Sequence, residues 1–201
     1  MAQKQLDPIV WIDLETGGTD PAIHQITQIA AIVTTGGPEL EEIGEPFERK
    51  ICLIPGHFTQ EALKVQGFSK KVWDAESCPI EVALNQLVDY VRPHAHTCVN
   101  AKGKKYKAAY VGGYNVSFDV DFLRAASGRN KVWLPLMTWT GGYFDVLQLL
   151  RWHTIGAAEE PSRFQLRSAC DWLGLPPFSA HDAAEDIRNT VKLARVLLCG
   201  I

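Results

Sequence analysis

The chain has 201 residues, of which 46% are hydrophobic and 21% are charged. This length and composition are typical of one globular domain with a sizeable core, so we predict a single domain over residues 1–201. The formal charge of −3 argues against a protein that coats long nucleic acids through a broad basic face, because such binding depends on many phosphate contacts. A small nucleic-acid footprint remains compatible with this charge.

The cysteines and the N-terminus bear on the cellular compartment. The five cysteines occur singly, without a C-x-x-C pair or zinc-ligand spacing, so we expect reduced, mostly packed thiols. The first residues lack the apolar run of a signal peptide, and no stretch of about eighteen apolar residues predicts a membrane span. We therefore expect a protein that works in the cytoplasm and does not contact a membrane.

The first half of the chain predicts an antiparallel meander of three strands, followed by two helices. Ile9 to Asp13 are mostly β-branched or aromatic, which indicates a strand buried on both faces, and Gly17-Gly18 end it in a turn. The glycines and proline at 36–38 predict a hairpin connection between the second and third strands. The other predicted elements are strands in Gln25 to Thr35 and within Phe47 to Ile54, and helices over Thr59 to Val65 and Pro79 to Val91.

The second half predicts further strands interleaved with helices, as in a mixed sheet with helices on its faces. Ala108 to Gly112 indicates a short buried strand, and Trp133 to Met137 is a further candidate. Four lysines between Lys102 and Lys107 form the only local basic cluster; we favour a solvated loop over a flexible loop that steers phosphate. Helices are expected over Ser117 to Ala126, Phe144 to His153, Gln165 to Leu173 and His181 to Leu198.

A first motif, Asp13-Leu14-Glu15-Thr16, follows the first strand. Successive strand side chains point to opposite faces, so Asp13 and Glu15 project from one side. Two carboxylates held this close repel each other unless a positive charge lies between them, and a divalent metal ion supplies that charge. The alternative is a pair of exposed acids on an edge strand, but acids are depleted from strands as hydrophobic as this one.

A second motif lies where a glycine turn leads into a helix. Asn115 is placed to cap that helix, and Phe118 and Phe122 share one helix face that can pack in the core or meet a ligand. Asp119 falls in the first turn, where an acid is favourable near the positive helix end. The local chemistry leaves the choice between Asp119 and Asp121 as a ligand open.

A third motif begins the last predicted helix, after the Pro176-Pro177 break. Ser179 and Asp182 resemble a capping box, which places His181 in or just before the first turn and Asp186 about one turn later. The positive end of the helix dipole disfavours imidazolium, which suits His181 to act as a general base near neutral pH.

Taken in order, D-x-E-T, N-x-x-F-D and H-x-x-x-x-D resemble the motifs of the DEDDh, or DnaQ-like, 3′→5′ exonuclease superfamily. The resemblance extends from Val10 to about Leu197. It implies an α/β fold similar to ribonuclease H, in which a mixed sheet of an antiparallel meander plus parallel strands is flanked by helices. It also implies two divalent metal ions, Mg²⁺ or Mn²⁺, as cofactors.

The resemblance assigns roles residue by residue. It makes His181 the general base and favours Asp119 over Asp121. The acids that it implies as metal ligands are Asp13, Glu15, Asp119 and Asp186. The residues that it places around the terminal nucleotide are Leu14, Thr16, Gln66, Asn115 and Phe118.

Three positions depart from the family pattern at the nucleotide end of the site. Gly17 stands where many relatives have a second threonine, Tyr114 where several have histidine, and Gln66 where proofreading members often have histidine. None is an implied metal ligand, so the departures bear on substrate preference. Asp145 resembles a common acid that supports the metal-binding residues, and an N-terminal helix cap explains it equally well.

These observations favour a metal-dependent 3′→5′ exonuclease that acts on single-stranded or frayed DNA and releases nucleoside 5′-monophosphates. An exoribonuclease similar to ribonuclease T or oligoribonuclease uses the same chemistry, and a non-catalytic nucleic-acid or polymerase-binding module is an alternative of another class. A role in proofreading or repair would imply a polymerase or repair partner. Because the chain ends soon after its last predicted helix, we expect a stand-alone nuclease or a partner bound through the domain surface.

Overall fold

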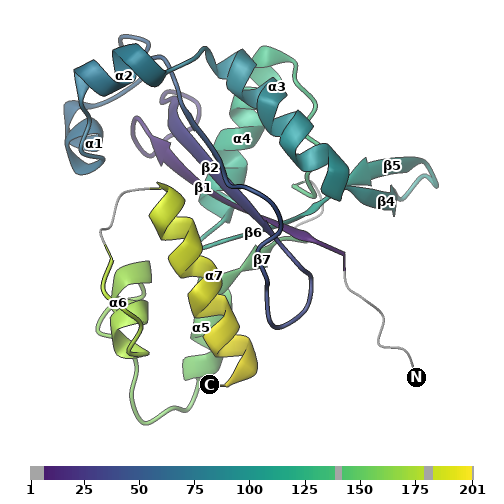
Figure 1. Ribbon diagram of the computed structural model, residues 1–201, viewed down its shortest axis with the longest axis vertical. Coiled ribbons are helices and arrows are strands. Elements are labelled where there is room, and N and C mark those ends of the chain that lie inside the picture. Colours follow the sequence, from purple (N-terminus) through teal and green to yellow (C-terminus); the bar gives the residue numbers. More distant parts are fainter. Residues whose placement is uncertain (1–6, 139–141, 179–182, 201) are drawn as a thin grey trace.

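A five-stranded mixed sheet, in the order β3-β2-β1-β6-β7, runs through the centre of the protein (Figure 1). The computed structural model describes residues 7–138, 142–178 and 183–200. Strand β2 is antiparallel to both β1 and β3, whereas β6 runs parallel to β1 and β7 parallel to β6. The strands are β1 (Ile9–Thr16), β2 (Ile26–Thr34), β3 (Phe47–Lys50), β6 (Tyr110–Gly113) and β7 (Phe144–Asp145).

The predicted antiparallel meander is confirmed, and β1 lies at its edge and at the centre of the complete sheet. The residues of β1 from Ile9 to Ile12 are buried, as expected for a strand covered on both faces. The connection from β2 to β3 is longer than a hairpin turn and occupies residues 35–46. It brings Leu40, which is only 1% exposed, into the core beside β1 and α7 (Ala183–Cys199).

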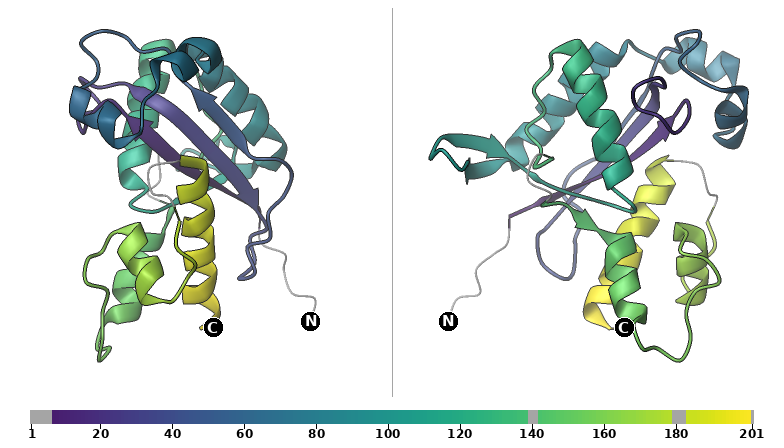
Figure 2. Two further views of the ribbon diagram at one scale, coloured as in Figure 1. Left: turned by 60° about the vertical axis from the view of Figure 1, so that its left-hand side comes forward. Right: turned by 180° about the vertical axis from the view of Figure 1, so that it is seen from behind.

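Helices cover both faces of this sheet (Figure 2). Because strand side chains alternate, Val10, Ile12 and Leu14 face one core and Ile9 and Trp11 face the other. The first core includes residues of α3 (Ile80–Val91) and α4 (Ser117–Asn130); the second includes residues of α5 (Val146–Thr154), α6 (Leu166–Trp172) and α7. By the same alternation, Asp13 and Glu15 are directed to the face that α7 covers.

Two short helices lie beyond the carboxyl end of β1 (Figure 1). The first, α1 (Gln60–Val65), begins where predicted, since the Thr59 hydroxyl accepts a hydrogen bond from the Ala62 N–H at 3.1 Å. The second, α2 (Lys70–Glu76), has no counterpart in the prediction. It buries only Trp73, so no apolar periodicity marks it in the sequence.

The lysine-rich segment belongs to a hairpin and is not a loop throughout. A 3₁₀ turn, η1 (Arg92–His94), leads into β4 (His96–Val99), which pairs with β5 (Lys105–Ala108) as a separate two-stranded sheet. The buried strand predicted over 108–112 therefore begins later, at Tyr110.

The predicted strand at Trp133 to Met137 is wrong. Only one isolated bridge, between Ala109 and Leu136, forms there. Pro135 interrupts the segment and has no N–H to donate to a strand ladder.

The five cysteines are all free, in agreement with the absence of a disulfide framework. In the part of the chain that the structure describes, no helix combines the length and the apolar character needed to cross a membrane.

Candidate active site

The site forms where the sheet opens between β1 and β6. Their parallel pairing ends at Trp11 and Gly112, so the later part of β1 has no strand beside it on that edge. The Leu14 N–H instead donates a hydrogen bond to the Asp119 carboxylate, 3.0 Å away. Asp119 lies in the first turn of α4, directly after β6, and so reaches the end of β1.

Three of the four predicted metal-binding acids gather at this end of β1. Asp13 and Glu15 come from β1 and Asp186 from the first turn of α7, and each can offer one carboxylate oxygen within 4.8 Å of the others. Like charges this close are unfavourable without a cation, and oxygen ligands are those that Mg²⁺ and Mn²⁺ prefer. The chemistry of this donor set therefore fits a hard divalent cation.

Asp119 lies outside this group of three but next to it. Its carboxyl is buried, with 5% of the residue exposed, and burial raises its pKa well above the usual value. The nearby charges of Glu15 and Asp145 act in the same direction, whereas the hydrogen bond from the Leu14 N–H opposes them. Asp121, the alternative ligand, is exposed and pairs with Arg124 at 3.3 Å; the choice of Asp119 stays a prediction.

The predicted general base lies outside the described residues. His181, with Ser179 and Asp182 of the proposed capping box, falls in 179–182. The described part of α7 begins at Ala183 and carries Asp186 into the site. The role of His181 therefore stays a prediction.

The two apolar residues predicted at the terminal nucleotide adjoin acids of the site in the chain, Leu14 between Asp13 and Glu15 and Phe118 directly before Asp119, and both pack with the first core. Leu14 is 7% exposed, and Phe118 is half-buried with its ring 4.9 Å from that of Phe122. Phe118 and Phe122 thus share a face, as their spacing predicts. The part of Phe118 that stays exposed leaves it able to contact a base.

Asn115 does not cap α4. Val116 takes the N-cap position without a side-chain hydrogen bond, and Asn115 precedes it with a left-handed backbone at φ 55°. Asparagine tolerates this conformation better than most residues, which accounts for its use at this turn. Its side chain is exposed.

Gln66 and Thr16 make contacts within the protein. The Gln66 amide N–H donates to the Thr16 carbonyl at 2.6 Å, and its oxygen accepts from the Thr27 hydroxyl at 2.7 Å. The Thr16 hydroxyl donates to the Gly18 carbonyl at 2.7 Å. Gln66 therefore ties the end of α1 to the end of β1, a contact that the sequence did not indicate.

The departure at Gly17 has a steric reason. A Cβ at this position would collide with the His57 carbonyl and with Phe58. The Gly17 N–H also donates to the Gln25 carbonyl at 2.8 Å, which holds the backbone in place. A threonine, as many relatives have here, would not fit this loop.

Asp145 is both a helix cap and a support of the site. Its Oδ1 accepts hydrogen bonds from the N–H of Leu147, at 3.0 Å, and from that of Asn115, at 3.1 Å. The first bond caps α5, as predicted, and the second holds the turn that leads to Phe118 and Asp119. One carboxylate thus joins two elements that are thirty residues apart.

We expect Asp145→Ala to lower the free energy of unfolding by about 1–2 kcal/mol, since it removes a cap and leaves two N–H groups without their acceptor. The displaced turn should also lower turnover by up to about 10²-fold. Asp145→Asn, which keeps an acceptor oxygen, is the matched control and should retain most stability. Urea unfolding and steady-state kinetics measure both effects; equal stability of Asp145→Ala and the wild type would contradict this role.

The chain resembles known nucleases in sequence. Residues 10–99 match the RNase_T family, described as exonuclease. A ribonuclease T from Marinobacter nauticus is 27% identical over 212 residues, covering 96% of this chain and 81% of the relative. The chain is therefore similar to exonucleases of the RNase_T family, as the motif resemblance to the DEDDh, or DnaQ-like, superfamily predicts. A PolC-type DNA polymerase III from Thermotoga maritima is 25% identical over 193 residues, or 92% of this chain and 11% of the polymerase.

Solved structures of exonuclease I have a similar fold over almost the whole chain. Exonuclease I of E. coli in complex with a dT13 oligonucleotide superposes with a TM-score of 0.73 at 21% identity, over 96% of this chain and 41% of that one. Exonuclease I of Methylocaldum szegediense superposes with a TM-score of 0.73 at 24% identity, over 96% of this chain and 40% of that one. The ribonuclease H-like mixed sheet predicted from the sequence is therefore confirmed, and the chain spans less than half of these exonucleases.

Proposed function

We propose that this chain is a metal-dependent 3′→5′ exonuclease that acts on single-stranded or frayed DNA ends and releases nucleoside 5′-monophosphates. The observation that carries the proposal is the convergence of Asp13, Glu15 and Asp186 within 4.8 Å, beside the buried Asp119. The proposal treats residues 1–201 as one exonuclease domain.

The four acids would hold two divalent ions, Mg²⁺ or Mn²⁺. Asp13, Glu15 and Asp186 offer the converging oxygens, and the raised pKa of Asp119 indicates a carboxyl whose ionised form needs a nearby cation. When bound, such ions activate the attacking water and stabilise the charge that develops on the phosphate and the leaving oxygen.

The remaining residues would position the strand and move a proton. His181 would accept the proton of the attacking water, a contribution worth about 10²–10⁴ in rate. Leu14 and Phe118 would contact the terminal base, and such apolar contact does not depend on which base is present. Thr16 and Asn115 would hold the same nucleotide. Gln66 would act through its hydrogen bond to the Thr16 carbonyl.

An exoribonuclease is the second candidate. It is favoured by the ribonuclease T relative, which this chain matches over 81% of the relative's length. DNA is favoured by the similar fold of exonuclease I, which has been solved with a dT13 oligonucleotide. We also propose that the chain could work with a polymerase or repair partner. The polymerase partner is suggested by the PolC-type relative, which is itself a DNA polymerase.

The test is degradation of 5′-labelled single-stranded DNA and of matching RNA, with Mg²⁺, with Mn²⁺ and with a chelator. We expect a ladder that shortens from the 3′ end, requires metal and is absent for Asp13→Ala. The polymer degraded faster decides between the two substrates. Retained binding without degradation of either polymer would instead identify a non-catalytic nucleic-acid-binding module.

A further inference from the structure

Charge is unevenly distributed along this acidic chain. No Asp or Glu occurs between Asp89 and Asp119, and the same stretch carries Arg92 and four lysines. The lysines, all exposed, are Lys102, Lys104, Lys105 and Lys107. In a protein of net charge −3, this segment is a local positive region.

The β4–β5 hairpin holds these lysines in an ordered arrangement. Asn100 shapes the turn, because its side-chain oxygen accepts hydrogen bonds from the N–H groups of Lys102, at 3.0 Å, and Lys104, at 2.9 Å. Lys105 and Lys107 are two positions apart on β5 and so share one face. Binding a partner there would cost less ordering entropy than binding to a disordered loop.

A groove of about 630 Å³ lies beside the hairpin, between α3 and the segment that follows α4. Three cations line it: Lys107 from β5, Arg92 from η1 directly after α3, and Lys131 directly after α4. Two acids reduce this charge, since Glu81 also lines the groove and Asp89 pairs with Arg92 at 3.1 Å. The three cations still outnumber them. We call this surface, with the hairpin lysines, the basic groove.

An aromatic side chain completes the basic groove. Trp133 lines it and is 57% exposed, so much of its side chain is accessible from the groove. Cations along a groove, with an exposed aromatic ring, are the combination by which proteins bind single-stranded nucleic acid, phosphates to the cations and a base to the ring. An acidic peptide could use the cations but has no general need of the ring.

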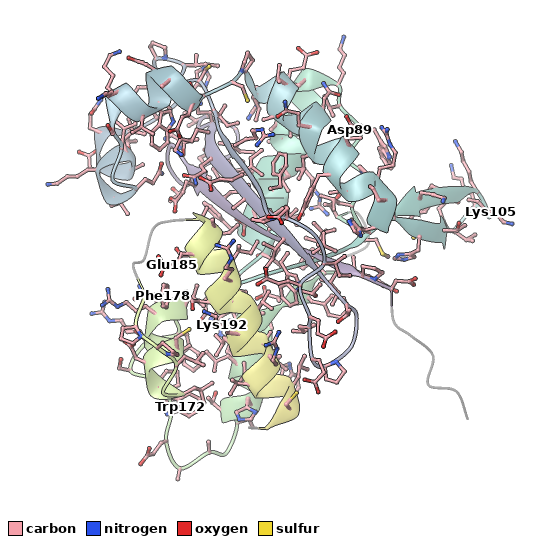
Figure 3. All side chains as sticks on the ribbon, viewed as in Figure 1. Asp89, Lys105, Trp172, Phe178, Glu185 and Lys192 are labelled. Atoms are coloured by element: carbon pink, nitrogen blue, oxygen red, sulfur yellow. The ribbon has the colours of Figure 1, made fainter. Side chains whose placement is uncertain are left out.

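The basic groove is remote from the acid cluster. The hairpin precedes β6, whose first residue pairs with Ile9, the first residue of β1, whereas Asp13 and Glu15 lie at the other end of β1. Figure 3 shows Lys105 on the hairpin well separated from Glu185 in the first turn of α7. The strand rise of β1 and the further length of the hairpin give a span of roughly 30 Å, or about nine stacked nucleotides.

We propose that the basic groove is a second contact for single-stranded nucleic acid, which binds the part of the strand lying upstream of the 3′ end in the active site. The direction of the strand in this inference rests on the proposed function, whereas the binding of the strand to the basic groove does not. It means that long strands are held at two places and short ones only at the catalytic end.

The test measures binding of a 5′-labelled oligothymidylate of about 20 nucleotides by fluorescence anisotropy, in chelator so that no cleavage occurs. For Lys105→Gln/Lys107→Gln we expect the slope of log affinity against log salt to become less steep by about 1.4, since two phosphate contacts are lost. Trp133→Leu, which keeps an apolar side chain, should weaken binding by about 5- to 150-fold through lost stacking. The matched control, Arg163→Gln/Arg167→Gln, removes two exposed cations elsewhere and should change neither quantity.

Cleavage of a labelled trinucleotide with Mg²⁺ separates this inference from the proposed function. All these variants should cleave it like the wild type, because it is too short to reach the basic groove. Failure of the wild type to cleave it would count against the exonuclease, while the anisotropy result would still report on the groove. The inference would be overturned by unchanged binding in both groove variants, or by a loss of binding in the control variant as large as in the groove variants. It would also be overturned if oligoglutamate displaced the labelled DNA as effectively as an unlabelled oligonucleotide does.

Discussion

Replacing Asp13 or Asp186 by alanine is expected to lower turnover by more than about 10⁴-fold, further than His181→Ala. The two acids belong to the group whose carboxylates approach within 4.8 Å, so either loss would disrupt metal binding. That removes water activation and charge compensation together, whereas His181→Ala would remove only a proton acceptor, worth about 10²–10⁴. Single-turnover kinetics on labelled single-stranded DNA measure the three rates.

Asp121→Ala is the control for this comparison. Asp121 is an exposed acid of α4 whose partner is Arg124, at 3.3 Å, so its loss should leave turnover close to that of the wild type. A result in which His181→Ala was the most damaging of the set would show that the roles are assigned wrongly.

Asp119→Asn is expected to abolish turnover and yet to stabilise the metal-free protein. Burial raises the pKa of Asp119, so the folded protein keeps its proton at pH values where the unfolded chain has lost it. The free energy of unfolding of the wild type, without metal, therefore falls as pH rises above about 4 toward the folded-state pKa. Asparagine removes this penalty and keeps an oxygen to accept from the Leu14 N–H.

Thermal unfolding in chelator at about pH 5 and about pH 8 tests this, with an expected rise in Tm for Asp119→Asn of at least about 2 °C at the higher pH. Added Mg²⁺ should raise the Tm of the wild type by more than that of the variant, because the variant keeps Asp13, Glu15 and Asp186 but lacks the fourth acid, and a ligand stabilises the fold in proportion to how tightly it binds. Asp121→Asn should match the wild type in both conditions. A lower Tm for Asp119→Asn in chelator would mean that Asp119 contributes to stability as an anion.

Much of the fold could be predicted from local patterns. The β-branched run of β1, the Thr59 cap of α1 and the apolar periodicity of α3 each identify their elements without reference to the rest of the chain. Helix α2 and the β4–β5 hairpin could not be found in this way. The first buries only Trp73 and the second stands largely outside the core, so neither leaves a hydrophobic period in the sequence.

The sequence by itself determined that Asp13 and Glu15 share one side of a strand and that Asp119 and Asp186 each lie near the start of a helix. These are short-range consequences of backbone geometry. Only the tertiary structure decided that Asp186 meets the acids of β1 and that Asp119 accepts a hydrogen bond from the Leu14 N–H where β6 separates from β1. It also decided that Gln66 and Asp145 anchor the surrounding turns. The same holds for the basic groove, whose cations come from three elements. Such contacts depend on how strands and helices far apart in the chain pack together, and no local pattern of residues encodes that packing.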